Sequence, residues 1–214
     1  MGLFSKKPIQ TSSTSPLYTL GSQKSLLIVG LGNPGKEYVG TRHNIGFACI
    51  EAFTKDNEQF ANWVTKKELK CEIASGVFGG VRILAVKPTT FMNLSGEAVQ
   101  QVQNFYKLPS SETVVLHDEL DLEFGQIRTK VGGGSAGHNG LKSIIKNSSD
   151  DFGRIRIGIN NNHRTKNDEK DFVLKPFSKD EQDNLKNLYK EINSILTETI
   201  YSGKLTTETR SFII

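Results

Sequence analysis

The chain has 214 residues, of which 36% are hydrophobic and 23% are charged, a composition typical of one globular domain. No apolar run approaches the roughly 20 residues that a membrane-spanning helix needs, so no membrane partner is expected. The two cysteines, Cys49 and Cys71, form no CxxC pair and have no metal-type spacing. They are expected to be free, buried thiols, which indicates a cytoplasmic protein.

The net charge of +4 is unevenly distributed along the chain. Residues 1–24 contain three lysines and no acid, and residues 126–175 contain ten basic side chains against five acidic ones. The second segment fits a polyanionic partner, although a solvated surface is the simpler interpretation. Its basic residues are Arg128, Lys130, Lys142, Lys146, Arg154, Arg156, Arg164, Lys166, Lys170 and Lys175.

Residues 1–24 are predicted to form a disordered tail, because "QTSSTSP" is rich in Ser and Thr and lacks an apolar period. The tail has no apolar core of a secretory signal and no arginine of a transit peptide. The start "MGLFSK" places a serine at position 5, whereas the N-myristoylation motif requires Ser or Thr at position 6. Residues 25–214 are predicted to form one domain.

Predicted strands and helices alternate along this domain. Strands are expected at 26–30, 69–78, 81–87, 113–117, 126–131 and 154–159, and helices at 45–60, 95–107, 140–147 and 179–202. The last helix has the clearest ends, because Ser178 and Glu181 match a capping box and Gly203 follows its final turn. The alternation predicts an α/β fold in which helices cover a twisted, mixed β-sheet.

The first strand runs into Gly30-x-Gly32-x-x-Gly35, the pattern of a dinucleotide-binding turn. However, the polar residues "KEYVGTRHN" follow instead of an amphipathic helix, and no acidic residue ends a strand about 20 residues later. An NAD-dependent oxidoreductase is therefore a disfavoured alternative. Asn33 lies at the strand end, where it either meets a ligand or simply belongs to an Asn-Pro-Gly turn.

His43 lies in "GTRHNIGF", just before the first predicted helix. Asn44 is expected to be the N-cap of that helix, which places His43 at a loop–helix junction as a candidate general base. A lone histidine is more often structural. In "PTTFMNLSG", Phe91 and Met92 are read as a core edge, and Asn93 as a group able to hold a carbonyl oxygen or a water.

Acidic residues follow the strand that begins near Val114. Three interpretations remain open for Asp118, Glu119 and Asp121: a Mg²⁺ site, a carboxylate that orients a histidine, or a solvated acidic loop. The metal is disfavoured, because no second acidic cluster supplies further ligands.

A glycine-rich stretch, "GGGSAGHNGLKSIIK", follows the next predicted strand. Asn139 is either a helix N-cap or part of an anion site at the helix N-terminus, to which Lys130 and Lys142 add charge. In "RIRIGI", Arg154 and Arg156 share one face of a strand, facing either successive phosphates or solvent.

Together and in this order, "LIVGLGNPGKEYVGTRHNIGF", "KPTTFMNLSG", "LHDELDLEFG" and "GGGSAGHNGLKS", followed by "RIRIGI", resemble the bacterial-type peptidyl-tRNA hydrolase family. The resemblance covers Leu26 to about Ile200. It implies a monomeric esterase without metal or cofactor. Such an enzyme cleaves the ester between a peptide and the 3′ ribose of tRNA, which recycles tRNA dropped from stalled ribosomes.

The resemblance also implies roles for individual residues. His43 is the general base, Asp118 keeps it basic, Asn93 positions substrate and supports the water or oxyanion, and Asn33 helps to discriminate blocked from free aminoacyl-tRNA. The substrate- and tRNA-binding residues that it implies, Asn93 again among them, are Tyr38, Phe91, Met92, Asn93, Lys130, His138, Asn139, Lys142 and Arg156.

Two features depart from the family pattern. Ser135-Ala136 stands where many relatives carry a His-Gly or similar pair, and the tail of residues 1–24 precedes the usual start of the fold. The C-terminal "TTETRSFII" is left without a match to the family, and nothing is concluded from it. The alternative function is that of a non-catalytic RNA-binding relative of the same fold, which would keep the basic face without hydrolysis.

Overall fold

The computed structural model describes residues 24–161 and 169–212. Its centre is an eight-stranded sheet with the order β2-β3-β4-β1-β5-β7-β6-β8. The neighbours β4, β1, β5 and β7 are parallel, and the outer pairs are antiparallel. The strands are β1 (Ser25–Gly30), β2 (Val64–Lys66), β3 (Cys71–Phe78), β4 (Val81–Pro88), β5 (Thr113–Glu123), β6 (Gln126–Val131), β7 (Gly153–Asn160) and β8 (Thr209–Ser211).

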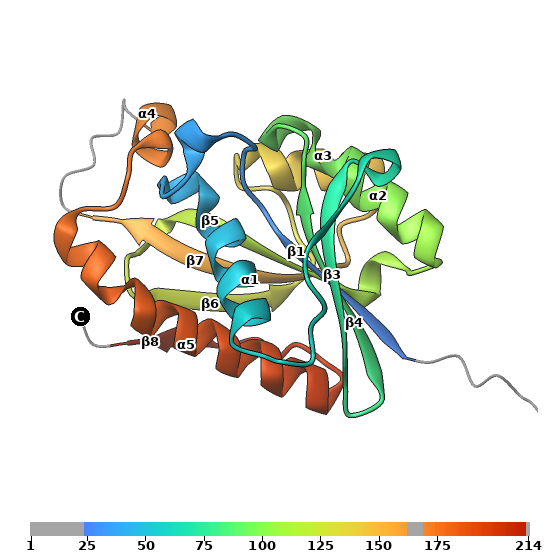
Figure 1. The fold of residues 1–214 in the computed structure, drawn as a ribbon. Coiled ribbons are helices and arrows are strands. Elements are labelled where there is room, and N and C mark those ends of the chain that lie inside the picture. The colour runs from blue at the N-terminus through green and yellow to red at the C-terminus, as the bar shows by residue number, and fades with distance from the viewer. Residues whose placement is uncertain (1–23, 162–168, 213–214) are drawn as a thin grey trace, which may run out of the picture.

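Helices cover both faces of this sheet (Figure 1). Ile28 of β1 packs in one apolar cluster with residues of α1, α4 and α5, whereas its neighbours Leu27 and Val29 pack in another with residues of α2 and α3. This alternation is the two-residue period of a strand that is buried on both sides. The helices are α1 (Ile45–Lys55), α2 (Ser95–Tyr106), α3 (Asn139–Asn147), α4 (Glu169–Leu174) and α5 (Lys179–Ser202).

Most predicted elements are confirmed, with three differences. The helix from residue 45 ends at Lys55 rather than at 60, and the strand from 113 continues to Glu123. Sequence analysis also missed β2, β8 and α4, which are three to six residues long. The capping box at the start of α5 is confirmed, because Ser178 Oγ accepts from the amide of Glu181 and Glu181 accepts in return.

The predicted tail, residues 1–24, lies outside the described residues except for Lys24, and so do Arg164 and Lys166. Among the described residues, no helix combines the length and apolar character needed to cross a membrane. Cys49 and Cys71 are both free and buried.

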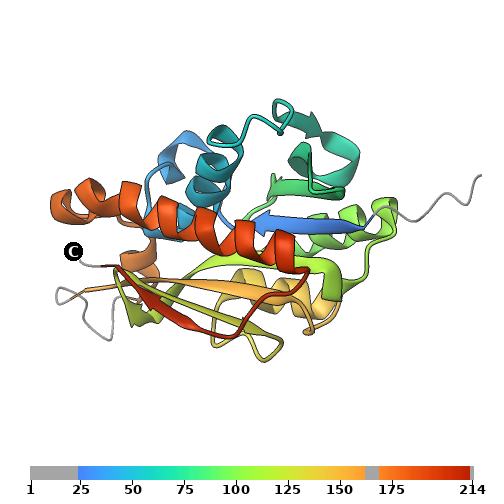
Figure 2. The same cartoon turned by 90° about the horizontal axis from the view of Figure 1, so that it is seen from below.

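The C-terminal segment, for which sequence analysis found no match, forms an edge strand. β8 pairs antiparallel with β6, and Figure 2 shows it at that edge of the sheet. Arg210 of β8 forms ion pairs with Glu198 of α5 at 2.5 Å and with Glu208 at 2.8 Å. The ring of Phe212 lies edge-on to Phe124, with centroids 6.0 Å apart. The strand is therefore anchored to both the sheet and α5.

The glycines after β1 serve close packing. A Cβ on Gly30 would lie 2.4 Å from the carbonyl oxygen of Gly46 in α1, and one on Gly32 would lie 2.7 Å from the ring of Phe47. Gly35, with φ 119°, leads only into a three-residue 3₁₀ helix, η1 (Lys36–Tyr38). Because no α-helix starts at this turn, it lacks the helix N-terminus that holds a dinucleotide pyrophosphate.

Helices α2 and α3 are packed closely at Gly96, where an added Cβ would lie 2.1 Å from the carbonyl oxygen of Ser143. We expect Gly96→Ala to lower the free energy of unfolding by about 1–3 kcal/mol, because backbone on the facing helix must move. Gly134→Ala is the control, since no atom lies within 4 Å of its added Cβ. Urea unfolding measures both; equal stability of the two variants would contradict the packing argument.

Candidate active site

Three segments meet where the central parallel strands end. His43 lies in the 3₁₀ helix η2 (Arg42–Asn44), which follows β1. Asp118 lies in β5, and His138 is the N-cap of α3. Figure 1 shows η2 beside α4 at this end of the sheet. The carboxyl ends of parallel strands are where α/β sheets usually bind ligands.

The His43 ring is paired with a buried carboxylate. Its Nδ1 lies 2.9 Å from Oδ1 and 3.0 Å from Oδ2 of Asp118, whose side chain is 3% exposed. An ionised carboxylate only accepts, so Nδ1 of His43 carries the hydrogen and donates it. In the neutral ring, Nε2 then has a free lone pair and is able to take a proton.

The second histidine contacts the same carboxylate. Nε2 of His138 lies 2.9 Å from Oδ1 of Asp118, and its Nδ1 accepts from the amides of Gly140 at 3.1 Å and Leu141 at 3.3 Å. Because backbone amides only donate, Nδ1 is the unprotonated nitrogen and Nε2 carries the hydrogen. His138 is thus a second donor to Asp118.

Burial and pairing shift the pKa values of this cluster in opposite directions. For His43, burial lowers the pKa, but the charge of Asp118 and the hydrogen bond to it raise the pKa above 6.5 overall. For Asp118, burial favours the neutral acid, but the charges and hydrogen bonds of His43 and His138 hold its pKa well below 3.8. His117, buried beside His138, has its pKa lowered to about 3, first by desolvation and then by His138.

The ligand atoms of His43, Asp118 and His138 lie within 4.8 Å of one another, the one such group among the described residues. The tautomer of His138 does not fit a metal, because its ligand nitrogen carries a hydrogen while the helix amides occupy the other. The Mg²⁺ interpretation of the acidic residues also fails geometrically. Glu119 pairs with Arg156 at 2.8 Å, and Asp121 is exposed.

The solvated-loop interpretation of these acids is wrong, since Asp118 and Glu119 are buried within β5.

Arg42 fixes the segment that carries the base, and sequence analysis missed it. Its buried guanidinium pairs with Glu181 at 2.6 Å, donates to the carbonyl of Pro176, and lies over the ring of Phe172 at 4.4 Å. Burial lowers the pKa of Arg42, and Glu181 opposes that shift. The capping-box glutamate of α5 therefore also holds η2.

The loop after β1 is held by two asparagines. The amide side chain of Asn44 bonds both the N–H and the C=O of Asn33, each at 2.9 Å. Asn44 is the N-cap of α1 as predicted, but its side chain makes no capping bond. Oδ1 of Asn33 accepts from the amide of Met92 at 2.8 Å, which leaves its amide nitrogen for a ligand.

Asn33 thus links the segment before His43 to the segment that carries Asn93. Met92 is buried, whereas Asn93 is exposed in the 3₁₀ helix η4 (Met92–Leu94), which packs against α3. The ring of Phe91, 53% exposed, lies edge-on to Tyr38 with centroids 6.3 Å apart. The structure therefore brings together Tyr38, Phe91, Met92 and Asn33, of which Met92 and Asn33 are buried.

A cavity of about 240 Å³ lies over the paired histidines. His43, Asp118, His138 and Asn139 line it together with Glu119, Leu120, Ala136, Gly137, Glu169, Lys170 and Val173. Asn139 is exposed at the first position of α3, and the cap itself is His138. The anion-site prediction is weakened, because His138 already occupies the amides of Gly140 and Leu141.

The basic face is only partly available. On β7 and β6, Arg154 stands opposite Lys130 and Arg156 opposite Arg128, so all four share one face. Arg154 is 1% exposed and donates to the carbonyls of Gly133 and Gly134, which contradicts both interpretations that left it accessible. Its buried guanidinium instead organises the glycine loop.

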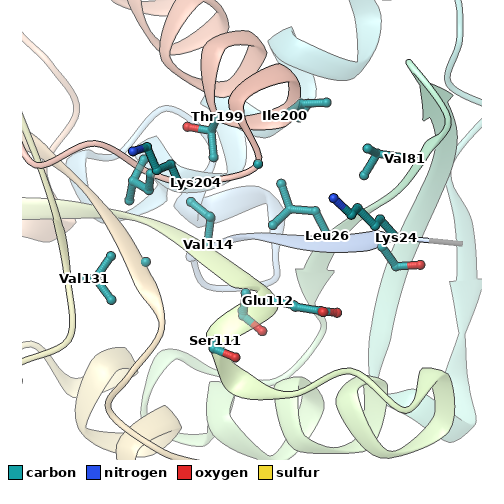
Figure 3. A pocket seen from close by; sticks show the side chains of 15 residues that line it. Lys24, Leu26, Val81, Ser111, Glu112, Val114, Val131, Thr199, Ile200 and Lys204 are labelled. Carbon is teal, nitrogen blue, oxygen red and sulfur yellow. The ribbon is translucent and has the colours of Figure 1, made fainter. Parts of the chain in front are cut away.

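A second cavity, of about 370 Å³, lies at the opposite end of the parallel strands (Figure 3). It is bounded by the start of β1, the start of β5 and the end of α5. Among the described residues that line it, Lys24, Lys204 and Glu112 are the charged ones, and none is a histidine. Without a base beside a carboxylate, this cavity lacks the chemistry found around His43.

Known proteins have sequences similar to that of this chain. The family model described as Peptidyl-tRNA hydrolase matches residues 27–212. The chain belongs to the peptidyl-tRNA hydrolase family. The peptidyl-tRNA hydrolase of Rickettsia bellii (strain OSU 85-389) is 48% identical over 156 residues, which cover 73% of this chain and 83% of the relative. That of Rickettsia conorii (strain ATCC VR-613 / Malish 7) is 45% identical over 171 residues, with coverages of 79% and 90%.

Solved structures share the fold. The crystal structure of peptidyl-tRNA hydrolase from Acinetobacter baumannii at 1.00 Å resolution matches with a TM-score of 0.78 and 32% identity, covering 85% of this chain and 91% of that one. A complex of peptidyl-tRNA hydrolase with N-propanol matches with a TM-score of 0.77 and 33% identity, covering 83% and 89%. The predicted single α/β domain with a mixed sheet is confirmed.

The pairing of His43 with Asp118 predicts its titration. We expect the NMR midpoint of His43 to lie above 6.5 in the native protein and below 6.5 in Asp118→Asn, because burial then acts without the carboxylate charge. His117 is the internal control: with a pKa of about 3, it should not titrate between roughly pH 5 and 8. An unchanged midpoint for His43 in Asp118→Asn would refute the assigned cause.

Proposed function

We propose that this chain hydrolyses the ester bond between a peptide, or an N-blocked aminoacyl group, and the 3′ ribose of tRNA. The observation that carries the proposal is the pairing of His43 with Asp118 in a cavity at the carboxyl ends of the strands. The family membership supports the same substrate. The product is free tRNA, which returns to translation after peptidyl-tRNA leaves a stalled ribosome.

The reaction follows from the tautomer of His43. Nε2 takes a proton from water as the water oxygen attacks the ester carbonyl, and Asp118 stabilises the imidazolium that forms. The bond to the ribose oxygen then breaks, and that oxygen takes the proton from Nε2 of the His43 imidazolium, which returns the base to its neutral form. An ester is activated enough for attack by water with the help of one base, so the proposed step needs no metal or cofactor.

The neutral side chains assigned to the substrate, of which Asn139 lines the cavity and the others lie outside its lining, suit a peptide of arbitrary sequence. Asn93 and Asn139 are exposed, and amide side chains bind peptide backbone regardless of the neighbouring side chains. We assign Asn93 to the substrate and the attacking water or oxyanion, and the free amide nitrogen of Asn33 to discrimination of the blocked amine. Tyr38 and Phe91, held edge to face, are assigned to an apolar wall, and the buried Met92 follows Phe91 beneath that surface.

The tRNA is proposed to lie on the face that carries Lys130. Burial lowers the pKa of Lys130, and the neighbouring charges of Arg154 and Arg156 lower it further. Like charges held this close repel one another, and a phosphate relieves that repulsion. Lys142 is exposed on α3, and Arg156 takes part while paired with Glu119. These phosphate contacts are independent of nucleotide sequence.

We also propose that the protein acts as a monomer in the cytoplasm, where peptidyl-tRNA is produced. All the groups assigned to hydrolysis come from one chain. The alternative, a non-catalytic RNA-binding relative, has no need of the buried His43–Asp118 pair, whose carboxylate is costly to bury.

Replacing the base tests the proposal. We expect His43→Ala to abolish cleavage of N-acetyl-aminoacyl-tRNA while tRNA binding persists, and Asp118→Ala to slow cleavage by about 10²-fold or more. Release of the acyl group is measured with EDTA present, so metal independence is tested at the same time. Near-native turnover by His43→Ala would rule out this mechanism.

The basic face makes a separate prediction. In a His43→Ala background, Lys130→Gln should weaken tRNA binding and reduce the salt dependence of log Kd by about one unit of slope. Lys190→Gln is the matched control, because Lys190 is exposed on α5, which covers the other face of the sheet. Fluorescence anisotropy with labelled tRNA measures both; equal slopes would place the tRNA elsewhere.

A further inference from the structure

We propose that His138 is a positioning residue, which holds Asp118 toward His43 and does not contact the substrate. The inference rests on the proposed hydrolysis and changes the role that sequence resemblance implied for His138, which was substrate binding. It assigns a separate task to each nitrogen of the ring.

The first task is to cap a helix. Nδ1 of His138 accepts from the amides of Gly140 and Leu141, the second and third residues of α3. Ordinary N-caps do this with an oxygen of Ser, Thr, Asp or Asn. Because the cap uses the lone pair of Nδ1, the neutral ring has its only hydrogen on Nε2. The N-terminus of α3 therefore sets the tautomer.

The second task is to donate to the carboxylate. Nε2 of His138 and Nδ1 of His43 lie at the same distance, 2.9 Å, from Oδ1 of Asp118. Two imidazole donors on one buried carboxylate satisfy it and restrict its rotation. A continuous chain of hydrogen bonds thus runs from the amides of α3 through His138 and Asp118 to His43.

This arrangement leaves His138 little capacity to bind a ligand. Both ring nitrogens are engaged, and the side chain is 9% exposed. The ring packs between His43, with centroids 5.2 Å apart, and His117, with centroids 5.0 Å apart. A substrate contact through either nitrogen would break the helix cap or the bond to Asp118.

Other charged groups also face His43 and bear on its titration. Asp118 and Glu119 face the cavity from β5, and Glu169 and Lys170 face it from α4. Loss of the His138 donor leaves these groups in place but frees lone-pair capacity on Asp118. The carboxylate then attracts the proton on His43 more strongly.

Two substitutions separate the two tasks. His138→Asn keeps an acceptor at the place of Nδ1 but has no donor at the place of Nε2, and His138→Gln does the reverse. We expect His138→Asn to fold with the cap of α3 intact, to lose about tenfold in kcat, and to shift the acid limb of kcat/KM to higher pH. We expect His138→Gln to keep kcat and the acid limb, with a thermal midpoint lower by about 3 °C.

Peptidyl-tRNA cleavage as a function of pH, with thermal unfolding of each variant, decides the matter. If both variants raise KM at unchanged kcat, His138 binds substrate and the inference is wrong. If the acid limb stays in place in His138→Asn, His138 is merely structural and the inference is also wrong. Failure of the native protein to cleave the ester would instead reject the proposed function.

Discussion

The site depends on one buried negative charge. The carboxylate of Asp118 is almost fully buried, and an ion in that position is costly unless hydrogen bonds and opposite charge compensate it. His43 and His138 supply that compensation, and both bond Oδ1 of the carboxylate. Their donation keeps Asp118 ionised, and the ionised carboxylate in turn keeps His43 in the tautomer of a base. Stability and basicity therefore have the same origin.

The fold meets this constraint by bringing three segments together at the carboxyl ends of the parallel strands. η2 follows the strand β1, Asp118 belongs to the neighbouring strand β5, and the cap of α3 comes from the loop after β6. Parallel pairing of β1 with β5 places both strand ends on the same side of the molecule. Arg42 then prevents η2 from moving by joining it to the start of α5 through Glu181.

Sequence reasoning predicted what depends on local pattern. The strands, the main helices and the α5 capping box follow from periodicity and capping chemistry, and the motifs identified His43 and Asp118. Sequence reasoning failed where a residue distant in the sequence determines the burial or the hydrogen-bond partner of a side chain. Arg154 alternates with isoleucines as a surface arginine would, yet it is buried and donates to carbonyls of the glycine loop. Nothing adjacent to His138 in the sequence indicates that its Nε2 meets β5.

The same distinction limits what charge counts reveal about tRNA affinity. Between residues 126 and 175 the sequence carries a formal excess of five positive charges. However, Arg154 is buried and donates to backbone carbonyls, and Glu119 partly neutralises the charge of Arg156. Counterion release depends on the cations that reach phosphate, so the formal excess overstates the electrostatic affinity. The internal arginines contribute differently: their repulsion makes the position of Lys130 more favourable for an anion. In the proposed binding mode, the phosphate contacts therefore depend more on Lys130 and Lys142 than on the formal charge of the segment.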